Sequence, residues 1–254
     1  MRIEQSFIPV RGVGERTERR LWEAGITRWD EFDGSVVGPT TAERIEAFRA
    51  EATDRLAAGD ADYFARTFPD PEGWRLYENF RDDACFFDIE TTGLDHDRDR
   101  VTTVSVHRGG ETTTLVRGDD LTAGALREHL GDASLLVTFN GKRFDVPFLE
   151  QSFDLTLDRP HLDLMYPCRR LDLTGGLKRI EREVGIGRDR PDVSGRDAVR
   201  LWREYEAGDR SALDTLVSYN REDAENLLTL ADHVTDRLHR ATVPDGGPPA
   251  PGRF

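Results

Sequence analysis

A short apolar run that ends in two acids does most to limit what this chain can fold into. Residues 84–90 read ACFFDIE, which has the length and composition of a buried strand. Side chains alternate along a strand, so Asp88 and Glu90 point to the same face. Asp is disfavoured in strands, and two like charges repel unless a cation lies between them. The pair therefore indicates either the solvated end of a strand or one half of a metal site.

The residues after this run predict an α/β fold. Residues 101–107 and 111–117 flank Gly109-Gly110 and predict a hairpin, and residues 134–140 and 161–165 predict two further strands. Helices are expected at 123–130, from Asp145 onward, and at 176–184, 196–206 and 211–237. Strands in the first part, followed by alternating helices and strands, indicate a mixed β-sheet flanked by helices.

We expect four segments along the chain. Residues 1–56 predict a small N-terminal helical domain, with helices near 15–24 and 41–56. Residues 57–83 contain the breaker Phe68-Pro-Asp-Pro71 and predict a linker that packs on the next domain. Residues 84–240 form the α/β domain, and the Pro/Gly-rich tail over 241–254 is expected to be disordered.

The charge balance argues at first against a nucleic-acid partner. The 254 residues carry 49 acids and 35 bases, a net charge of −14, whereas phosphate binding requires Lys and Arg. Lys occurs only at Lys142 and Lys178, however, and an acid-rich, Lys-poor composition is typical of proteins from a high-salt cytoplasm. There, screening shortens the reach of the global field, so local patches decide binding. A Lys-poor composition set by a GC-rich genome is the alternative to this halophilic interpretation.

Other sequence features place the chain in the cytoplasm. The two cysteines, Cys85 and Cys168, form no CxxC pair and no disulfide framework. The N-terminus has no apolar signal-peptide core, and no run of 18 apolar residues could span a membrane. We therefore expect a cytoplasmic protein without a membrane partner, whose oligomeric state the sequence leaves open.

Three further residues carry polar groups at positions that suit a site. Asp145 starts a helix after a buried strand, where an ordinary N-cap would explain it. Tyr219 and Asp223 are four residues apart on one helix face, where a hydrogen bond between them would explain both. Taken singly, each residue has this simpler explanation, and their combination decides the interpretation.

The combination resembles a known nuclease family. Residues 86–93 (FFDIETTG), 140–145 (NGKRFD) and 219–223 (YNRED) resemble the three exonuclease motifs of the DEDD family, in its tyrosine-containing branch. Residues 84–236 are similar to proofreading domains of family B DNA polymerases and to YprB-like ribonuclease H-like proteins. Residues 159–186 are similar to the YprB-like group in particular, although much of that group has His where this chain has Tyr219.

The resemblance implies a ribonuclease H-like fold and a metal-dependent 3′→5′ exonuclease with two Mg²⁺ or Mn²⁺ ions. Asp88 would bridge both ions, Glu90 and Asp223 would complete the site of the nucleophilic water, Tyr219 would orient that water, and Asp145 would support the second ion. Two cations can stabilise charge on the attacking and leaving oxygens, and hard oxygen ligands suit these metals. The expected nucleic-acid contacts within the motifs are Thr92, Gly93, Leu94, Asn140, Lys142 and Phe144.

Two alternatives keep the same fold. The first is a nucleic-acid-binding module without nuclease activity, against which the complete set of carboxylates argues. The second is a structure-specific endonuclease, against which Tyr219 argues. The expected partner is nucleic acid, with DNA favoured and RNA possible.

The N-terminal residues 7–32 resemble a helix-hairpin-helix motif. Gly12 and Gly14 would let backbone N–H groups approach a phosphate at a helix N-terminus, and Arg16 would add positive charge. Such contacts do not depend on base sequence. The alternative is a glycine-rich helix start within a structural cap, because the first helix of the motif is very short or missing.

Overall fold

The computed structural model describes residues 1–245 and 247–250 and divides the chain into two compact units. Unit 1 comprises residues 1–81 with the described residues from His233 onward, and unit 2 comprises Asp82–Asp232. The long helix α10 (Arg210–Thr242) contributes residues to both units.

Unit 2 is built on a five-stranded sheet of order β3-β2-β1-β4-β5. Its strands are β1 (Ala84–Thr91), β2 (Val101–Arg108), β3 (Glu111–Val116), β4 (Leu135–Thr138) and β5 (His161–Asp163). The pairs β1–β2 and β2–β3 are antiparallel, whereas β1–β4 and β4–β5 are parallel. The predicted mixed sheet flanked by helices is therefore confirmed.

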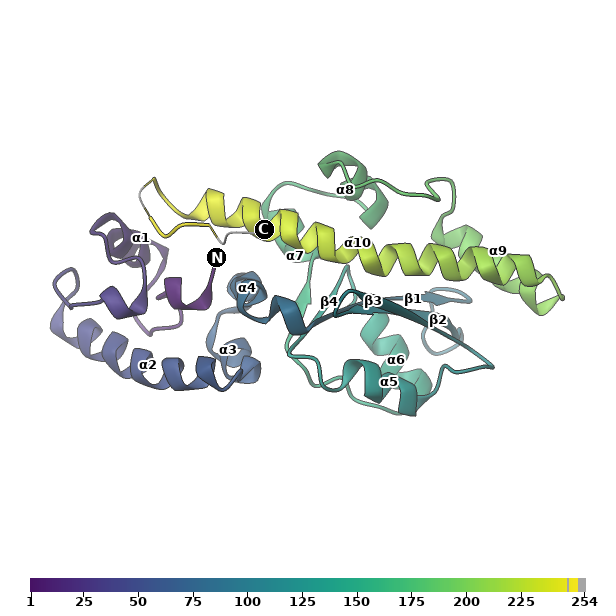
Figure 1. Ribbon diagram of the computed structural model, residues 1–254, viewed down its shortest axis with the longest axis horizontal. Coiled ribbons are helices and arrows are strands. Elements are labelled where there is room, and N and C mark those ends of the chain that lie inside the picture. The colour runs from purple at the N-terminus through teal and green to yellow at the C-terminus, as the bar shows by residue number, and fades with distance from the viewer. Residues whose placement is uncertain (246, 251–254) are drawn as a thin grey trace. The chain divides into compact units, whose positions relative to one another are not determined.

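Helices cover both faces of this sheet (Figure 1). The helices α5 (Ala123–Leu130) and α6 (Asp145–Phe153) lie on one face, and α10 runs along the other. Cys85, Phe87 and Ile89 of β1 belong to the buried core cluster that α5 and α6 complete. Because side chains alternate, Asp88 and Glu90 point to the opposite face, toward α10.

The remaining helices of unit 2 follow the parallel strands. They are α7 (Met165–Arg170), α8 (Leu177–Val184) and α9 (Gly195–Glu206). The strand expected over 161–165 is shorter than predicted, because α7 begins at Met165. The helix expected over 211–237 is longer and continues to Thr242, since Val234 and Leu238 extend its buried face.

Unit 1 is helical, as predicted for the N-terminal region. It contains α1 (Glu15–Glu23), α2 (Pro39–Ala57), α3 (Ala61–Thr67), α4 (Tyr77–Phe80) and short 3-10 helices that include η1 (Ile3–Gln5) and η3 (Asp70–Leu76). Where the sequence predicts a linker over 57–83, the structure has α3, η3 and α4. Phe64, Trp74 and Tyr77 are buried there, and the Phe64 ring stacks on that of Trp29, so the segment shares the core of unit 1.

The prediction of a disordered tail covers residues 241–254, of which the structure describes 241–245 and 247–250. Thr242 ends α10, and the Pro249 carbonyl accepts a hydrogen bond of 3.1 Å from Gln5 Nε2. Residues 246 and 251–254, which the same prediction covers, lie outside the described residues. Within the described part of the chain, no helix is both long and apolar enough to cross a bilayer.

Candidate active site

Three predicted carboxylates meet on the α10 side of the sheet. One carboxylate oxygen from each of Asp88, Glu90 and Asp223 lies within 4.8 Å of those of the other two. Glu90 and Asp223 are buried, and Asp88 is partly buried. The ladder between β1 and β2 shifts register between Glu90 and Thr91, which ends regular pairing beside this cluster. Buried acids at this spacing provide the hard oxygen ligands that Mg²⁺ and Mn²⁺ require.

Asp145 approaches the cluster from α6. It is 4% exposed. Burial, then the charge of Asp223 and then that of Asp145 raise the pKa values of Asp88 and Glu90. The preceding loop is shaped for this approach. Asn140 adopts a left-handed φ of 66°, and a Cβ at Gly141 would lie 2.3 Å from Thr138 Oγ1, so only glycine fits there.

Asp163 at the end of β5 stabilises the loop that precedes Asp145. Its carboxylate accepts hydrogen bonds from the backbone N–H groups of Asn140 (2.7 Å) and Lys142 (3.2 Å). Because these bonds use protein groups alone, the loop that leads to Asp145 is held without any ion. Phe144, the last residue of the loop, packs its ring 4.8 Å from that of Phe148.

The predicted nucleotide-contact residues after β1 form a tight turn. Thr92 Oγ1 donates to Asp99 Oδ1 (3.1 Å), and its backbone N–H donates to the Arg100 carbonyl (2.9 Å). A Cβ at Gly93 would lie 2.3 Å from Asp99 Oδ2, so a larger residue there would have to displace the Asp99 carboxylate. Leu94 is 85% exposed and presents an apolar surface beside the carboxylates' strand.

Tyr219 lies one turn before Asp223 on α10 and is 5% exposed. Its hydroxyl forms a hydrogen bond with Asp223. The Lys178 ammonium lies 4.3 Å from the centre of the ring. Burial, together with the nearby charges of Asp223 and Glu90, raises the pKa of Tyr219 far above its usual range, so the hydroxyl keeps its proton and can donate it in a hydrogen bond.

Burial raises the pKa values of all four carboxylates, and repulsion from other acids of the cluster adds to the rise at Asp88, Glu90 and Asp145. Burial first, and then the other acids, raise the pKa values of Asp88 and Glu90 well above normal. Burial raises the pKa of Asp145 to about 7, and it raises that of Asp223 to about 6 although Arg188 opposes the rise. Raised pKa values mean that the negative charge of these buried carboxylates is not fully compensated by the protein, and a bound divalent cation would compensate it.

The structure adds residues to this site that the sequence did not point out as functional. Asn220 is fully buried on α10, and its Nδ2 donates to Asp88 Oδ2 (2.8 Å) and to the Asp88 carbonyl (3.1 Å). Its Oδ1 has no hydrogen-bond partner among the described residues. Arg188, between α8 and α9, is paired with Asp223 and with Glu181 of α8. Asn220 occurs in the apolar stripe of the predicted helix, which was the one available signal.

The predicted contacts at the N-terminus belong to unit 1. Gly12 has a left-handed φ of 94°, Gly14 directly precedes α1, and Arg16 is exposed. A Cβ at Gly14 would meet no atom within 4 Å. The 3-10 helix η1 and a series of turns stand where a first helix of a hairpin motif would be.

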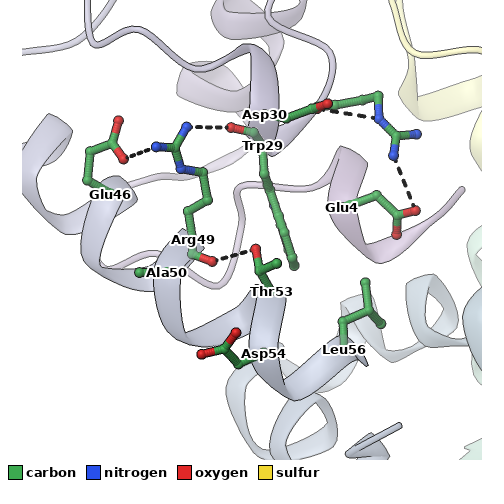
Figure 2. Close-up of a pocket in the computed structure, with 10 residues that line it drawn as sticks. Glu4, Trp29, Asp30, Glu46, Arg49, Ala50, Thr53, Asp54 and Leu56 are labelled. Carbon is green, nitrogen blue, oxygen red and sulfur yellow. Dashed lines mark hydrogen bonds and ion pairs between the residues drawn. The ribbon is translucent and has the colours of Figure 1, made fainter. Parts of the chain in front are cut away.

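A separate cavity of about 640 Å³ lies within unit 1 (Figure 2). None of the predicted site residues lines it. Its two arginines are paired with acids of its own wall: Arg49 lies 2.6 Å from Glu46, and Arg28 lies 3.5 Å from Glu4 and 3.6 Å from Asp30. The carboxylate cluster of unit 2 is therefore the better candidate for chemistry.

Comparison with known proteins identifies relatives of the region that contains the carboxylates. The sequence profile of the RNase H superfamily matches residues 85–235, which include all four carboxylates. A search of curated proteins found no match. A family B DNA polymerase from the hyperthermophilic archaeon Pyrobaculum calidifontis aligns with 63% of this chain and 25% of its own length, at 20% identity and a TM-score of 0.50. Brucella melitensis NrnC with bound Mg²⁺ aligns over 65% and 78% of the two chains (24% identity, TM-score 0.45), and the apo form of a nuclease over 62% and 74% (22% identity, TM-score 0.47).

Proposed function

The chain belongs to the RNase H superfamily, and from this premise we propose that it is a metal-dependent 3′→5′ exonuclease that hydrolyses nucleic acid, with DNA favoured. The superfamily match and the sheet order confirm the expected ribonuclease H-like fold and support a nuclease. The observation that carries the finer proposal is the meeting of Asp88, Glu90 and Asp223 within 4.8 Å, with Tyr219 bonded to the last of them.

We propose that the site holds two divalent cations, starting from the three carboxylates whose oxygens lie within 4.8 Å of one another. Asp88, Glu90, Asp145 and Asp223 provide carboxylate oxygens, and their raised pKa values follow from burial and from negative charge that cations would neutralise. Bound ions would stabilise charge on the oxygens of the scissile phosphodiester and lower the pKa of the attacking water. We propose Mg²⁺ or Mn²⁺, because the donors are hard oxygens alone.

The other side chains are proposed to position the metal ligands, the attacking water and the terminal nucleotide. Asn220 fixes Asp88 by its two hydrogen bonds, which sets the direction of a ligand that would otherwise rotate. Tyr219 stays neutral and can donate a hydrogen bond that orients the attacking water toward phosphorus. Thr92, Gly93 and Leu94, from one side, and Asn140, Lys142 and Phe144, from the second motif, are proposed to hold the terminal nucleotide.

The N-terminal segment is proposed to hold the nucleic-acid backbone. Arg11, Arg16 and Arg19, which are close to the start of α1 in the sequence, are exposed, and a Cβ at Gly14 would meet no atom within 4 Å. Backbone N–H groups at a helix start favour an anion, and such a contact fixes position without reading sequence. This segment and the preference for DNA belong to the same proposal.

Cleavage of end-labelled oligonucleotides tests the proposed activity. A 5′-labelled strand should shorten progressively from its 3′ end with Mg²⁺ or Mn²⁺, at low and at high KCl, and should stay intact with EDTA. Asp88→Ala or Asp223→Ala should lower the rate by about 10³-fold or more, since the transition state loses its electrostatic stabilisation. Asp214→Ala, an exposed acid on the same helix, is the matched control and should cleave normally.

The pattern of products distinguishes the alternatives. Internal fragments from a strand with a blocked 3′ end would establish an endonuclease. Binding without cleavage under every metal condition would establish a binding module. Full activity in Asp88→Ala would refute the assignment of the site.

A further inference from the structure

A buried guanidinium lies directly against the carboxylate cluster. The Arg188 side chain is 5% exposed, and its Nη2 donates to Asp223 Oδ1. The same side chain donates through Nε and Nη2 to Glu181, with Nη2 2.9 Å from Glu181 Oε1. Arg188 is thus shared between an acid of the cluster and an acid outside it.

Glu181 and the surrounding loop hold Arg188 from the side away from the cluster. Glu181 is fully buried on α8, and its two carboxylate oxygens accept hydrogen bonds from Nε and Nη2 of the guanidinium. The loop is tied to α10 by the Asp189 N–H, which donates to Glu222, and by Asn226 Nδ2, which lies 3.4 Å from the Gly187 carbonyl. These contacts would keep Arg188 in the neighbourhood even if its bond to Asp223 were broken.

The bond to Asp223 conflicts with the binding of an ion there. Asp223 is one of the three acids whose oxygens lie within 4.8 Å of one another. A guanidinium and a divalent cation on one carboxylate would repel each other across a few ångströms. Arg188 Nη1 makes no hydrogen bond among the described residues and lies 3.8 Å from Glu222 Oε2, a second acid outside the cluster.

We propose that Arg188 is a tethered counter-cation, which neutralises Asp223 in the metal-free protein and competes with the divalent ion for that carboxylate. This inference rests on the proposed function, because it takes the cluster to be a metal site. When the ion binds, Arg188 gives up Asp223 and keeps Glu181. The side chain therefore weakens metal binding and protects the empty site from the repulsion of its own acids.

Calorimetric titration of the full chain with Mn²⁺ tests the competition. Arg188→Gln keeps a polar side chain of similar length but removes the charge, and it should bind Mn²⁺ at least about tenfold more tightly, given the repulsion between a single and a double charge about 5 Å apart. In EDTA the same variant should melt at a lower temperature than the wild type. Arg188→Lys, which keeps the charge, and Arg190→Gln, an exposed arginine in the same loop, should bind Mn²⁺ as the wild type does.

A second measurement on the wild type does not depend on a variant that folds. The Nη2–H resonances of Arg188 in ¹⁵N-labelled protein should shift when diamagnetic Mg²⁺ is added, since Nη2 loses its bond to Asp223 while the bonds of Nε and Nη2 to Glu181 remain. Weaker Mn²⁺ binding by Arg188→Gln would overturn the proposal and make Arg188 a support for the ligand. Unchanged affinity in that variant, or an unchanged resonance at saturating Mg²⁺, would overturn it as well. A wild type that binds neither ion would refute the proposed function and this inference together, whereas a wild type that binds Mn²⁺ with no gain in Arg188→Gln would refute this inference alone.

Discussion

Asp145→Asn should stabilise the metal-free protein, and the gain should grow with pH. Burial raises the pKa of Asp145 to about 7, against 3.8 for the free side chain. The folded state therefore binds this proton more tightly than the unfolded state, and stability is lost as the pH rises from about 4 through about 7. Asn carries no charge at any of these pH values and keeps an oxygen that can accept the hydrogen bonds of Asp145.

The size of the effect follows from the shift. A shift of about 3 pKa units at about 1.4 kcal/mol each gives at most about 4 kcal/mol at pH 8 and about 2 kcal/mol at pH 5. Asp88 and Glu90 also have raised pKa values that depend in part on the charge of Asp145, so these figures are upper limits. For a unit of this size, 4 kcal/mol corresponds to a rise in melting temperature of roughly 8–16 °C.

Differential scanning calorimetry in EDTA at constant KCl measures this gain at both pH values. Asp214→Asn, on the exposed face of α10, serves as the control for removal of one negative charge. A gain equal at pH 5 and pH 8 would show that the stability change does not come from ionisation. A loss of stability at pH 8 would refute the reasoning that the buried acids repel one another in the absence of metal.

Three other substitutions separate the roles proposed for the site and for the N-terminal segment. Tyr219→Phe should leave Mn²⁺ affinity unchanged in titration calorimetry yet slow single-turnover cleavage by about 10²-fold, because it removes only the hydroxyl; an unchanged rate would exclude a role in orienting water. Asn220→Ala should weaken Mn²⁺ binding by roughly tenfold, since Asp88 loses the donor that fixes it, and equal affinity would show that Asp88 needs no such support. Gly14→Val should fold normally, because its Cβ enters open space, but should bind duplex DNA more weakly. The slope of log affinity against log salt should become shallower by about one unit for each phosphate that the protein no longer neutralises. Identical slopes for the variant and the wild type would make this segment a structural cap.

The boundary of unit 1 explains why a point substitution is preferred to a deletion. Removal of residues 1–56 would leave α3, η3 and α4 without the helices on which they pack within unit 1. Arg75 in η3 is fully buried and paired with Glu18 of α1 at 2.9 Å. Removal of Glu18 would leave this charge buried and short of a partner, which destabilises a fold strongly.

The sequence predicted the sheet well because its pattern is local. The runs around Phe87, Val104 and Leu136 are apolar enough to indicate buried strands, and the structure has strands at all three places. The segment 57–83 was harder to predict, since Pro69 and Pro71 suggest a break in regular structure. In the structure these prolines flank the start of η3, where a missing N–H costs nothing, and the chain continues as helix.

The candidate site was predictable only in part, for a related physical reason. Asp88, Glu90, Asp145 and Asp223 have spacings typical of a family, so they can be found one motif at a time. Arg188 lies in an irregular loop, and its partners Glu181 and Asp223 are 7 and 35 residues away. No periodicity links such residues, so a pairing of this kind appears only once the chain is folded.

The two buried cysteines can be used to measure how often the structure around them opens to solvent. Cys85 and Cys168 are both buried and form no disulfide, and burial raises the pKa of the Cys85 thiol to about 12. A thiol reacts as its thiolate, so neither sulfur should react with a disulfide reagent while the surrounding structure stays closed. Cys85 lies three residues before Asp88 on β1, and the rate at which it is labelled therefore reports how often the strand that carries the first carboxylate becomes exposed to solvent.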